Sequence, residues 1–336
     1  MSTIKDVAKA AGVSAATVSA VVNGSAYVSP ALRARVLEAV DKQGYAPSQL
    51  ARNLRRGRSG LIAVAVADLS NMFFSRVICA AEAAVSAWGY SLVVFNSDEN
   101  PEAEKQILYR VRTLRCEGLV LVPVSGALSP ALREFNGRLL PTVLFGRTID
   151  DDRLDTVTID NFSASYQVTN YLIDLGHTRI GAITGSMHSS TGKARFEGMQ
   201  AAMSAKALTL DSRFVRTGEF REEVAYSAAR SMFEQPERPT ALYVASGAMA
   251  LGALRALSDV GLNCPEDVSV ASTDNIPGIR GLKPALTRAE HPIVAMVNES
   301  IRLLMDRINR GARAEPHNVV FPPTLAVGDS CAPLRK

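Results

Sequence analysis

The chain has 336 residues, of which 47% are hydrophobic and 21% are charged, so we expect a globular protein with more than one domain. It contains no apolar run long enough to span a membrane, and its first residues carry no apolar export segment, which together predict a cytoplasmic protein. The four cysteines are widely separated and form no C-x-x-C pair. This spacing argues against structural zinc and disulfides, and the sequence predicts no metal and no other cofactor.

The positive charge is concentrated near the N-terminus. Residues 1–60 contain nine Lys or Arg and three Asp or Glu, a net charge of +6, whereas the remaining residues contain 28 and 30, a net charge of −2. Such asymmetry predicts an N-terminal module that faces nucleic-acid phosphates, attached to a nearly neutral body. The alternative is a basic surface that is simply solvated.

Two short helices are predicted at the start of the chain. Thr3 and Asp6 have the spacing of a capping box for a first helix, which ends in a tight turn at Gly12. Ser14 then caps a second helix over residues 15–23, whose valines form an apolar face.

A third helix is predicted from Pro30 to Gly44, because proline is favoured at the first helical position. Two short helices joined by a glycine turn, with a third packed beneath them, predict a helix-turn-helix; a generic three-helix bundle is the alternative. The apolar stripe of the third helix is predicted to consist of Leu32, Val36, Leu37 and Val40.

Several runs of residues in this segment match a known family. They are Thr-Ile-Lys-Asp-Val-Ala-Lys-Ala-Ala-Gly-Val-Ser-Ala-Ala-Thr-Val-Ser at residues 3–19, Asn-Gly at 23–24, Tyr-Val-Ser at 27–29 and Gly-Tyr-Ala-Pro at 44–47. With these runs the segment strongly resembles the DNA-binding head of the lactose-repressor/galactose-repressor family. The resemblance implies a transcriptional repressor rather than an enzyme, acting as a homodimer on palindromic double-stranded operator DNA.

The positions from which members of that family read base edges fall on three alanines, Ala15, Ala16 and Ala20. Alanine offers no hydrogen bond and can only touch a thymine methyl group or permit a close approach. Thr17 and Asn23 keep polar contacts, which we assign to phosphates. We therefore expect direct readout of the bases by this helix to be limited, so that specificity depends on the hinge and on DNA deformability.

Residues 48–59 resemble the hinge helix of the same family, which orders on operator DNA and lies in the minor groove. Leu54 occupies the position of an apolar wedge between base pairs, and Arg55 is one of several arginines able to neutralise crowded phosphates. Without the resemblance, Leu54 would be interpreted as an ordinary linker leucine. The predicted domains are a head at 1–47, this hinge at 48–59 and a core at 60–336.

The core alternates between apolar strands and helices, which predicts an α/β fold with buried parallel sheets. Two such series in tandem predict two lobes, about 60–160 with 291–320 and about 161–290 with 321–336. Ligands of parallel sheets bind beyond the carboxyl ends of the strands. Strands are predicted at 61–67, 91–95, 118–123, 140–145, 179–183, 240–244 and 268–272, with helices between them.

The family resemblance extends over essentially the whole core. It is carried by Asp-Leu-Ser-Asn-Met-Phe-Phe-Ser at 68–75, Thr-Ile-Asp-Asn at 158–161, Leu-Gly-His-Thr-Arg-Ile at 175–180 and Thr-Asp-Asn at 273–275. It implies a core like that of periplasmic sugar-binding proteins, with a small polar, sugar-like effector between the lobes. The effector-binding residues that it implies are Phe73, Phe74, Asp160, Ser189, Thr191, Arg195, Phe220 and Asp274.

Two departures from the family pattern bear on the effector. Ser246-Gly247 replaces an Asn-Asp pair and so removes a carboxylate, while Ser189 stands where some relatives carry a charged residue. The second change disfavours a phosphorylated or carboxylated effector. The alternatives are an enzyme, which lacks a recognisable phosphate loop or nucleophile motif, a plain solute-binding protein, and a constitutive DNA binder with a vestigial cleft.

Overall fold

The computed structural model describes residues 2–24, 26–45, 58–135, 140–275, 283–310 and 315–334. Contacts between residues divide the chain into two compact units, Met1–Ser59 and Gly60–Lys336. None of the helices in these described ranges is long and apolar enough to cross a membrane. We call the first unit the head and the second the core.

The described part of the head is a bundle of three helices, α1 (Ile4–Ala11), α2 (Ala15–Asn23) and α3 (Pro30–Lys42). Its local signals act as predicted. The Thr3–Asp6 capping box is present, and Gly12 ends α1 in the left-handed conformation, with a φ of 62°. The helices pack around a small apolar core formed by Val7, Ala8, Ala11, Val18, Val21, Val36 and Ala39.

One prediction for the head is wrong. Leu37 was placed in the apolar stripe of α3, but 44% of its surface is exposed. Successive residues of a helix point about 100° apart, so Leu37 cannot share the buried face of Val36, and Ala39 takes the core position instead.

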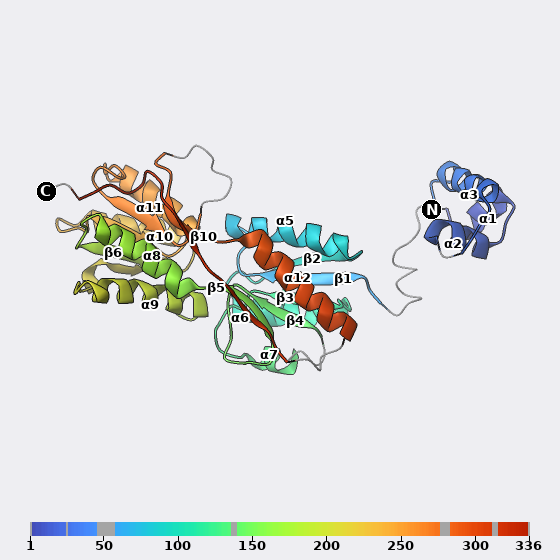
Figure 1. Ribbon diagram of the computed structural model, residues 1–336, viewed down its shortest axis with the longest axis horizontal. Helices are drawn as coiled ribbons and strands as arrows, with labels where there is room; N and C mark the ends of the chain where they lie inside the picture. Colours follow the sequence, from blue (N-terminus) through green and yellow to red (C-terminus); the bar gives the residue numbers. More distant parts are fainter. Residues whose placement is uncertain are drawn as a thin grey trace. The chain divides into compact units, whose positions relative to one another are not determined.

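The first lobe of the core contains a parallel sheet of six strands in the order β11-β5-β4-β3-β1-β2. Helices α5 and α12 cover one face of this sheet and α6 and α7 the other (Figure 1). The strands are β1 (Leu61–Val66), β2 (Ser91–Asn96), β3 (Gly118–Leu121), β4 (Thr142–Phe145), β5 (Asp155–Ile159) and β11 (Asn318–Phe321). The helices are α5 (Met72–Ala87), α6 (Pro101–Thr113), α7 (Pro130–Phe135) and α12 (Ile293–Arg310).

The second lobe repeats this plan with the strand order β12-β10-β9-β8-β6-β7, in which only the β10–β12 pair is antiparallel. Helices α8 and α9 pack together on one face, and α10 and α11 pack together on the other. The strands are β6 (Ile180–Thr184), β7 (Val215–Thr217), β8 (Ala241–Val244), β9 (Ser269–Ser272), β10 (Thr287–Glu290) and β12 (Thr324–Ala326). The helices are α8 (Asn161–Asp174), α9 (Ser190–Ala205), α10 (Glu222–Phe233) and α11 (Gly247–Asp259), with a 3-10 turn at Ser212–Phe214.

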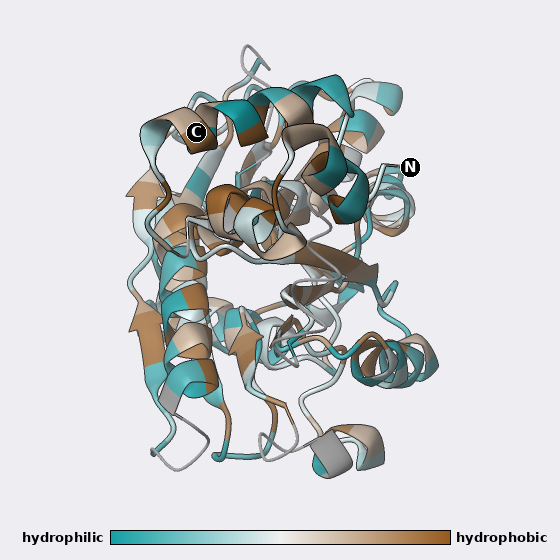
Figure 2. Cartoon of the chain, turned by 90° about the vertical axis from the view of Figure 1, so that its right-hand side faces the viewer, coloured by the Kyte–Doolittle hydropathy of each residue, from teal (hydrophilic) through white to brown (hydrophobic). Residues whose placement is uncertain are grey.

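The predicted α/β fold with two parallel-sheet lobes is confirmed. Strands such as β1, β3 and β8 are strongly apolar and buried, in agreement with the hydrophobic strand segments of Figure 2, which is why continuous apolar runs identified them. The chain passes between the lobes three times, from β5 to α8, from β10 to α12 and from β11 to β12. The sequence analysis did not predict β5, β7, β10, β11, β12 or α12. Of the six elements that the three crossings connect, it therefore predicted only α8.

Candidate functional site

A pocket lies between the two lobes of the core, where the carboxyl ends of both sets of strands meet. Its residues enclose about 590 Å³ of space, part of which is open to solvent. Its polar lining residues are Asp68, Asn71, Glu99, Arg147, Asn161, Thr191, Arg195, Ser246, Asp274 and His291, and its aromatic ones are Phe73, Phe74, Phe145 and Phe220.

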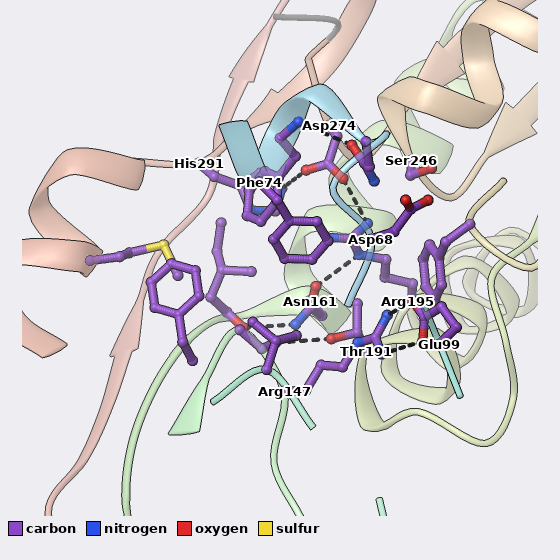
Figure 3. A pocket seen from close by; sticks show the side chains of 18 residues that line it. Asp68, Phe74, Glu99, Arg147, Asn161, Thr191, Arg195, Ser246, Asp274 and His291 are labelled. Carbon is purple, nitrogen blue, oxygen red and sulfur yellow. Dashed lines mark hydrogen bonds and ion pairs between the residues drawn. The ribbon is translucent and has the colours of Figure 1, made fainter. Parts of the chain in front are cut away.

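Arg195 is the centre of a buried network on the second lobe's side of the pocket (Figure 3). Its Nε donates to Asn161 Oδ1 at 2.8 Å, and its Nη1 donates to the carbonyl of Ala245 at 2.5 Å and to Asp274 Oδ2 at 3.1 Å. Only 5% of Arg195 is exposed. Three acceptors therefore fix the guanidinium before any ligand arrives.

Asp274 is held between two basic side chains. Burial alone would raise the pKa of its carboxyl, but Arg195 and His291 outweigh this effect and lower the pKa. His291 Nε2 lies 2.7 Å from Asp274 Oδ1 and 2.5 Å from the carbonyl oxygen of Thr273. One N–H cannot point at both oxygens, and its geometry favours Thr273, so Asp274 Oδ1 is left without a directed hydrogen bond among the described residues.

A second ion pair stands on the first lobe's side. The Arg147 guanidinium donates to both oxygens of Glu99, at 2.8 and 2.6 Å, and also to the carbonyl of Pro123 at 3.1 Å. Its central carbon lies 5.3 Å from the centre of the Phe220 ring, which belongs to the other lobe. Arg147 thus joins a carboxylate of one lobe to an aromatic face of the other by a cation–π contact.

Two loops with unusual backbones face each other beside this pair. Asp98 and Glu99 have φ values of 50° and 54°, and Glu219 and Phe220 have values of 51° and 58°. Left-handed non-glycine residues are uncommon and concentrate at functional sites. The loops are linked by Arg221, whose Nη2 donates to Asp98 Oδ1 at 2.9 Å and to the Asp98 carbonyl at 3.0 Å.

The aromatic residues shape the apolar wall of the pocket. Phe73 and Phe74 open α5, where Asn71 caps the helix by accepting the Phe73 N–H at 3.0 Å. Their rings meet edge to face, with centroids 5.1 Å apart, and Phe73 also contacts the His291 ring at 6.0 Å. An apolar wall with a few fixed polar groups is the usual composition of a small-molecule site.

The structure brings six of the eight predicted effector residues into this pocket, namely Phe73, Phe74, Thr191, Arg195, Phe220 and Asp274. The remaining two are not among its lining residues. Asp160 caps α8, accepting the Ser163 N–H at 2.8 Å, and Ser189 caps α9, accepting the Gly192 N–H at 3.0 Å. Both polar side chains are used by the helix that follows them.

The sequence analysis missed Asp68, Asn71, Glu99, Arg147, Asn161 and His291 as pocket residues. Asp68, Asn71 and Asn161 stand within the family-like runs at 68–75 and 158–161, which was a usable signal. Glu99 and Arg147 are 48 positions apart, and no local pattern shows that they pair. No group of three or more His, Cys, Asp or Glu in the described part of the chain is arranged to hold a metal.

The DNA-reading residues predicted in the head lie on or near α2. Ala16 is exposed there, while Ala15 and Ala20 are partly buried. Thr17 is also partly buried, and its hydroxyl oxygen lies 2.9 Å from that of Ser14 at the start of the helix. The side chain of Asn23, and the whole of Leu54 and Arg55, lie outside the described residues.

Comparison with known proteins places these two units in one family. Residues 3–48 match the model of the bacterial regulatory proteins of the lacI family, and residues 169–331 match that of the periplasmic binding protein-like domain. The HTH-type transcriptional repressor PurR of Edwardsiella ictaluri is 33% identical over 99% of this chain and 97% of its own length. The chain belongs to the lacI family.

Further relatives agree with this assignment. The PurR repressor of Proteus mirabilis is 35% identical over 92% of this chain and 91% of its own. These relatives are repressors and not enzymes, so this lacI-family member is a DNA-binding transcriptional regulator.

Solved structures show the same architecture. The transcriptional regulator CelR in complex with cellobiose matches with a TM-score of 0.73 and 29% identity, over 98% of this chain and all of that one. The lac repressor dimer bound to operator and the anti-inducer ONPF matches with a TM-score of 0.84, over 98% of this chain and 99% of that one. At 24% identity, the second likeness shows the fold alone.

Proposed function

We propose that this regulator is a repressor whose operator affinity is set by a small, polar, sugar-like effector bound in the pocket between its lobes. The observation that carries the proposal is the union, in one chain, of a lacI-family head with a pocket that combines aromatic walls and fixed charged groups. Aromatic rings can cover the apolar side of a sugar ring, and Arg195 and Asp274 offer charge-assisted hydrogen bonds to its hydroxyls. The cellobiose complex of a 29% identical relative supports this class of ligand.

We propose that three successive segments of the chain have different roles. Residues 1–47 read DNA, residues 48–59 form a hinge that orders on the operator, and residues 60–336 hold the effector and join two copies into a homodimer. A dimer presents two heads to the two halves of a palindrome. We place the protein in the cytoplasm, where its DNA lies.

Effector control is proposed to act by linkage. The lobes touch across the pocket, since Thr191 donates to the Gly146 carbonyl at 2.9 Å and Ser190 Oγ accepts the Thr148 N–H at 2.8 Å. A ligand bridging them changes their closure, and this change sets whether two hinges can order together on DNA. The effector can shift operator affinity only by its differential affinity for the two states.

In the head we propose that Ala15, Ala16 and Ala20 face base edges, that Thr17 and Asn23 contact phosphates, and that Leu54 and Arg55 act in the minor groove. No residue of α2 is charged, so this helix contributes shape and methyl contacts rather than charged hydrogen bonds. Most sequence discrimination then comes from bending the centre of the operator.

The test is selection of bound sequences from a random DNA pool by the full-length protein. We expect a palindrome with a deformable central step. Leu54→Ala should abolish the preference, while Ala16→Gly and Ala20→Gly leave it unchanged; the reverse pattern contradicts the hinge-based readout. If the protein binds DNA only weakly and in a salt-sensitive way, and enriches no sequence either alone or with a metabolite extract added, the proposal that it is a sequence-specific repressor is contradicted.

A further inference from the structure

Asp68 is a buried carboxylate of the pocket that is only half used by the protein. It follows β1, and 7% of it is exposed. Its Oδ1 accepts two hydrogen bonds from Ser70, from the backbone N–H at 2.8 Å and from the hydroxyl at 2.7 Å. Its Oδ2 accepts none from the described residues, and Figure 3 marks no interaction between Asp68 and the other lining side chains.

The other charged groups of the pocket already have partners. Arg147 is paired with both oxygens of Glu99, and Arg195 is paired with Asp274, against which His291 also packs. Arg221 also interacts with Asp68, but the raised pKa of Arg221 owes most to its hydrogen bond with Asp98 and only a smaller part to Asp68. Among the described residues, the negative charge of Asp68 is therefore the one in the pocket without an ion-pair partner.

Unlike Asp274 Oδ1, Asp68 Oδ2 is not a fully buried atom without a partner, so it remains open to the space of the pocket, where a donor on a ligand can reach it. We propose that Asp68 determines effector specificity: its Oδ2 accepts a hydrogen bond from a hydroxyl or ammonium group of the ligand, and its charge excludes anions. This inference rests on the proposed function, because it requires the pocket to hold the effector. The effector class becomes a polyhydroxylated compound, neutral or carrying an amine, without an acidic group.

The structure also provides a clean substitution. In Asp68→Asn the amide oxygen can still accept both hydrogen bonds from Ser70, so the loop and the volume of the side chain are kept. Only the oxygen that faces the ligand changes, from a charged acceptor to an NH₂ donor. Asp152→Asn is a matched control, because Asp152 is an exposed carboxylate of the same lobe and does not line the pocket.

The experiment begins with thermal shifts of the full-length protein in a broad library of polyhydroxylated metabolites. The library contains neutral, amino and acidic versions of each skeleton, such as D-glucose, D-glucosamine, D-glucuronate and D-glucose 6-phosphate. We expect neutral or amino members to raise Tm and their acidic counterparts to have no effect. The strongest binder is then titrated by calorimetry into wild type, Asp68→Asn and Asp152→Asn.

We expect Asp68→Asn to weaken that binder by about tenfold or more, as loss of a charge-assisted hydrogen bond predicts, while Asp152→Asn stays within about twofold of wild type. An acidic compound as the tightest ligand, or equal affinity of Asp68→Asn and wild type, overturns the role of Asp68 and leaves the proposed function standing. If no member of the library binds while the protein still selects an operator, the sugar-like effector of the proposed function fails, and the inference fails with it.

Discussion

The two halves of the pocket are built differently. On the second lobe, Arg195, Asn161 and Asp274 form one buried network in which each group is held by another. On the first lobe, Glu99 lies in a left-handed loop, 16% of its side chain is exposed, and Asp68 keeps a free oxygen. Apart from Asp274 Oδ1, the polar groups of the second lobe's half are held by contacts within the protein, whereas Asp68 on the first lobe keeps hydrogen-bonding capacity for the ligand.

Removing Arg195 is expected to have the largest effect, because its guanidinium donates to three acceptors of the second lobe's network. Arg195→Met leaves the Asp274 carboxylate buried without its guanidinium and takes a donor from Asn161 and from the Ala245 carbonyl. We expect the free energy of unfolding to fall by about 3–5 kcal/mol, measured by urea denaturation.

The control for that change is Arg230→Met, which breaks a pair with Glu234 in which the two side chains are 51% and 49% exposed. Its effect should stay near 0.5 kcal/mol, as is usual for surface substitutions. A variant at Arg195 that is as stable as this control would mean that the network contributes nothing to the fold.

The matching substitution on the first lobe should cost less. In Glu99→Gln, Arg147 loses its ion pair but keeps the Pro123 carbonyl and the Phe220 ring. We expect a loss of about 1–3 kcal/mol in the same urea experiment. A loss as large as that of Arg195→Met would remove the contrast between the two halves.

The second lobe also buries His177, which is 3% exposed. Its Nε2 lies 3.0 Å from the Ala332 carbonyl and 3.1 Å from Ser269 Oγ, and its Nδ1 lies 3.0 Å from Thr240 Oγ1. Burial lowers the pKa of this imidazole below its usual 6.5. In the unfolded chain the ring therefore takes up a proton at a higher pH than in the folded protein.

Stability from His177 is consequently complete above about pH 6.5 and is lost as the pH falls below that value, by at most about 1.4 kcal/mol per pH unit for one proton. The measurement is urea unfolding from pH 8 to pH 5 for wild type and His177→Gln. We expect the advantage of wild type to shrink as the pH falls. A constant gap between the two would show that the buried ring has a normal pKa.

The smallest effect is expected where the halves meet. Arg221 and Asp98 are 40% and 61% exposed, so Arg221→Gln should change the free energy of unfolding by less than about 1 kcal/mol. It should nevertheless speed hydrogen exchange in the loops at 98–99 and 218–221, which this pair links. Arg230→Gln breaks an exposed pair at the C-terminal end of α10 and serves as the control, with no change expected in those loops.

The parts of the fold that could be predicted from the sequence are those that depend on local signals. The capping box at Thr3 and the continuous apolar runs of strands such as β1 depend on neighbouring residues only, and both are read correctly. Strand β5 was missed because its first residue, Asp155, is a carboxylate whose buried position depends on distant partners, the Arg307 guanidinium 152 positions away and the backbone N–H of His317. The family resemblance assigns Asp160 and Ser189 to the pocket because it matches positions in the sequence. It does not show that each of these side chains is already used to cap the helix that follows it.

The central claim is that the pocket and the operator site are thermodynamically coupled. The most direct measurement is operator affinity, by fluorescence anisotropy, with and without a saturating amount of the compound that raises Tm most, and the affinity of that compound with and without operator. Linkage requires the two ratios to be equal, and for a working switch we expect a factor of about 5 to 150. An operator affinity that does not change at saturation would contradict the account.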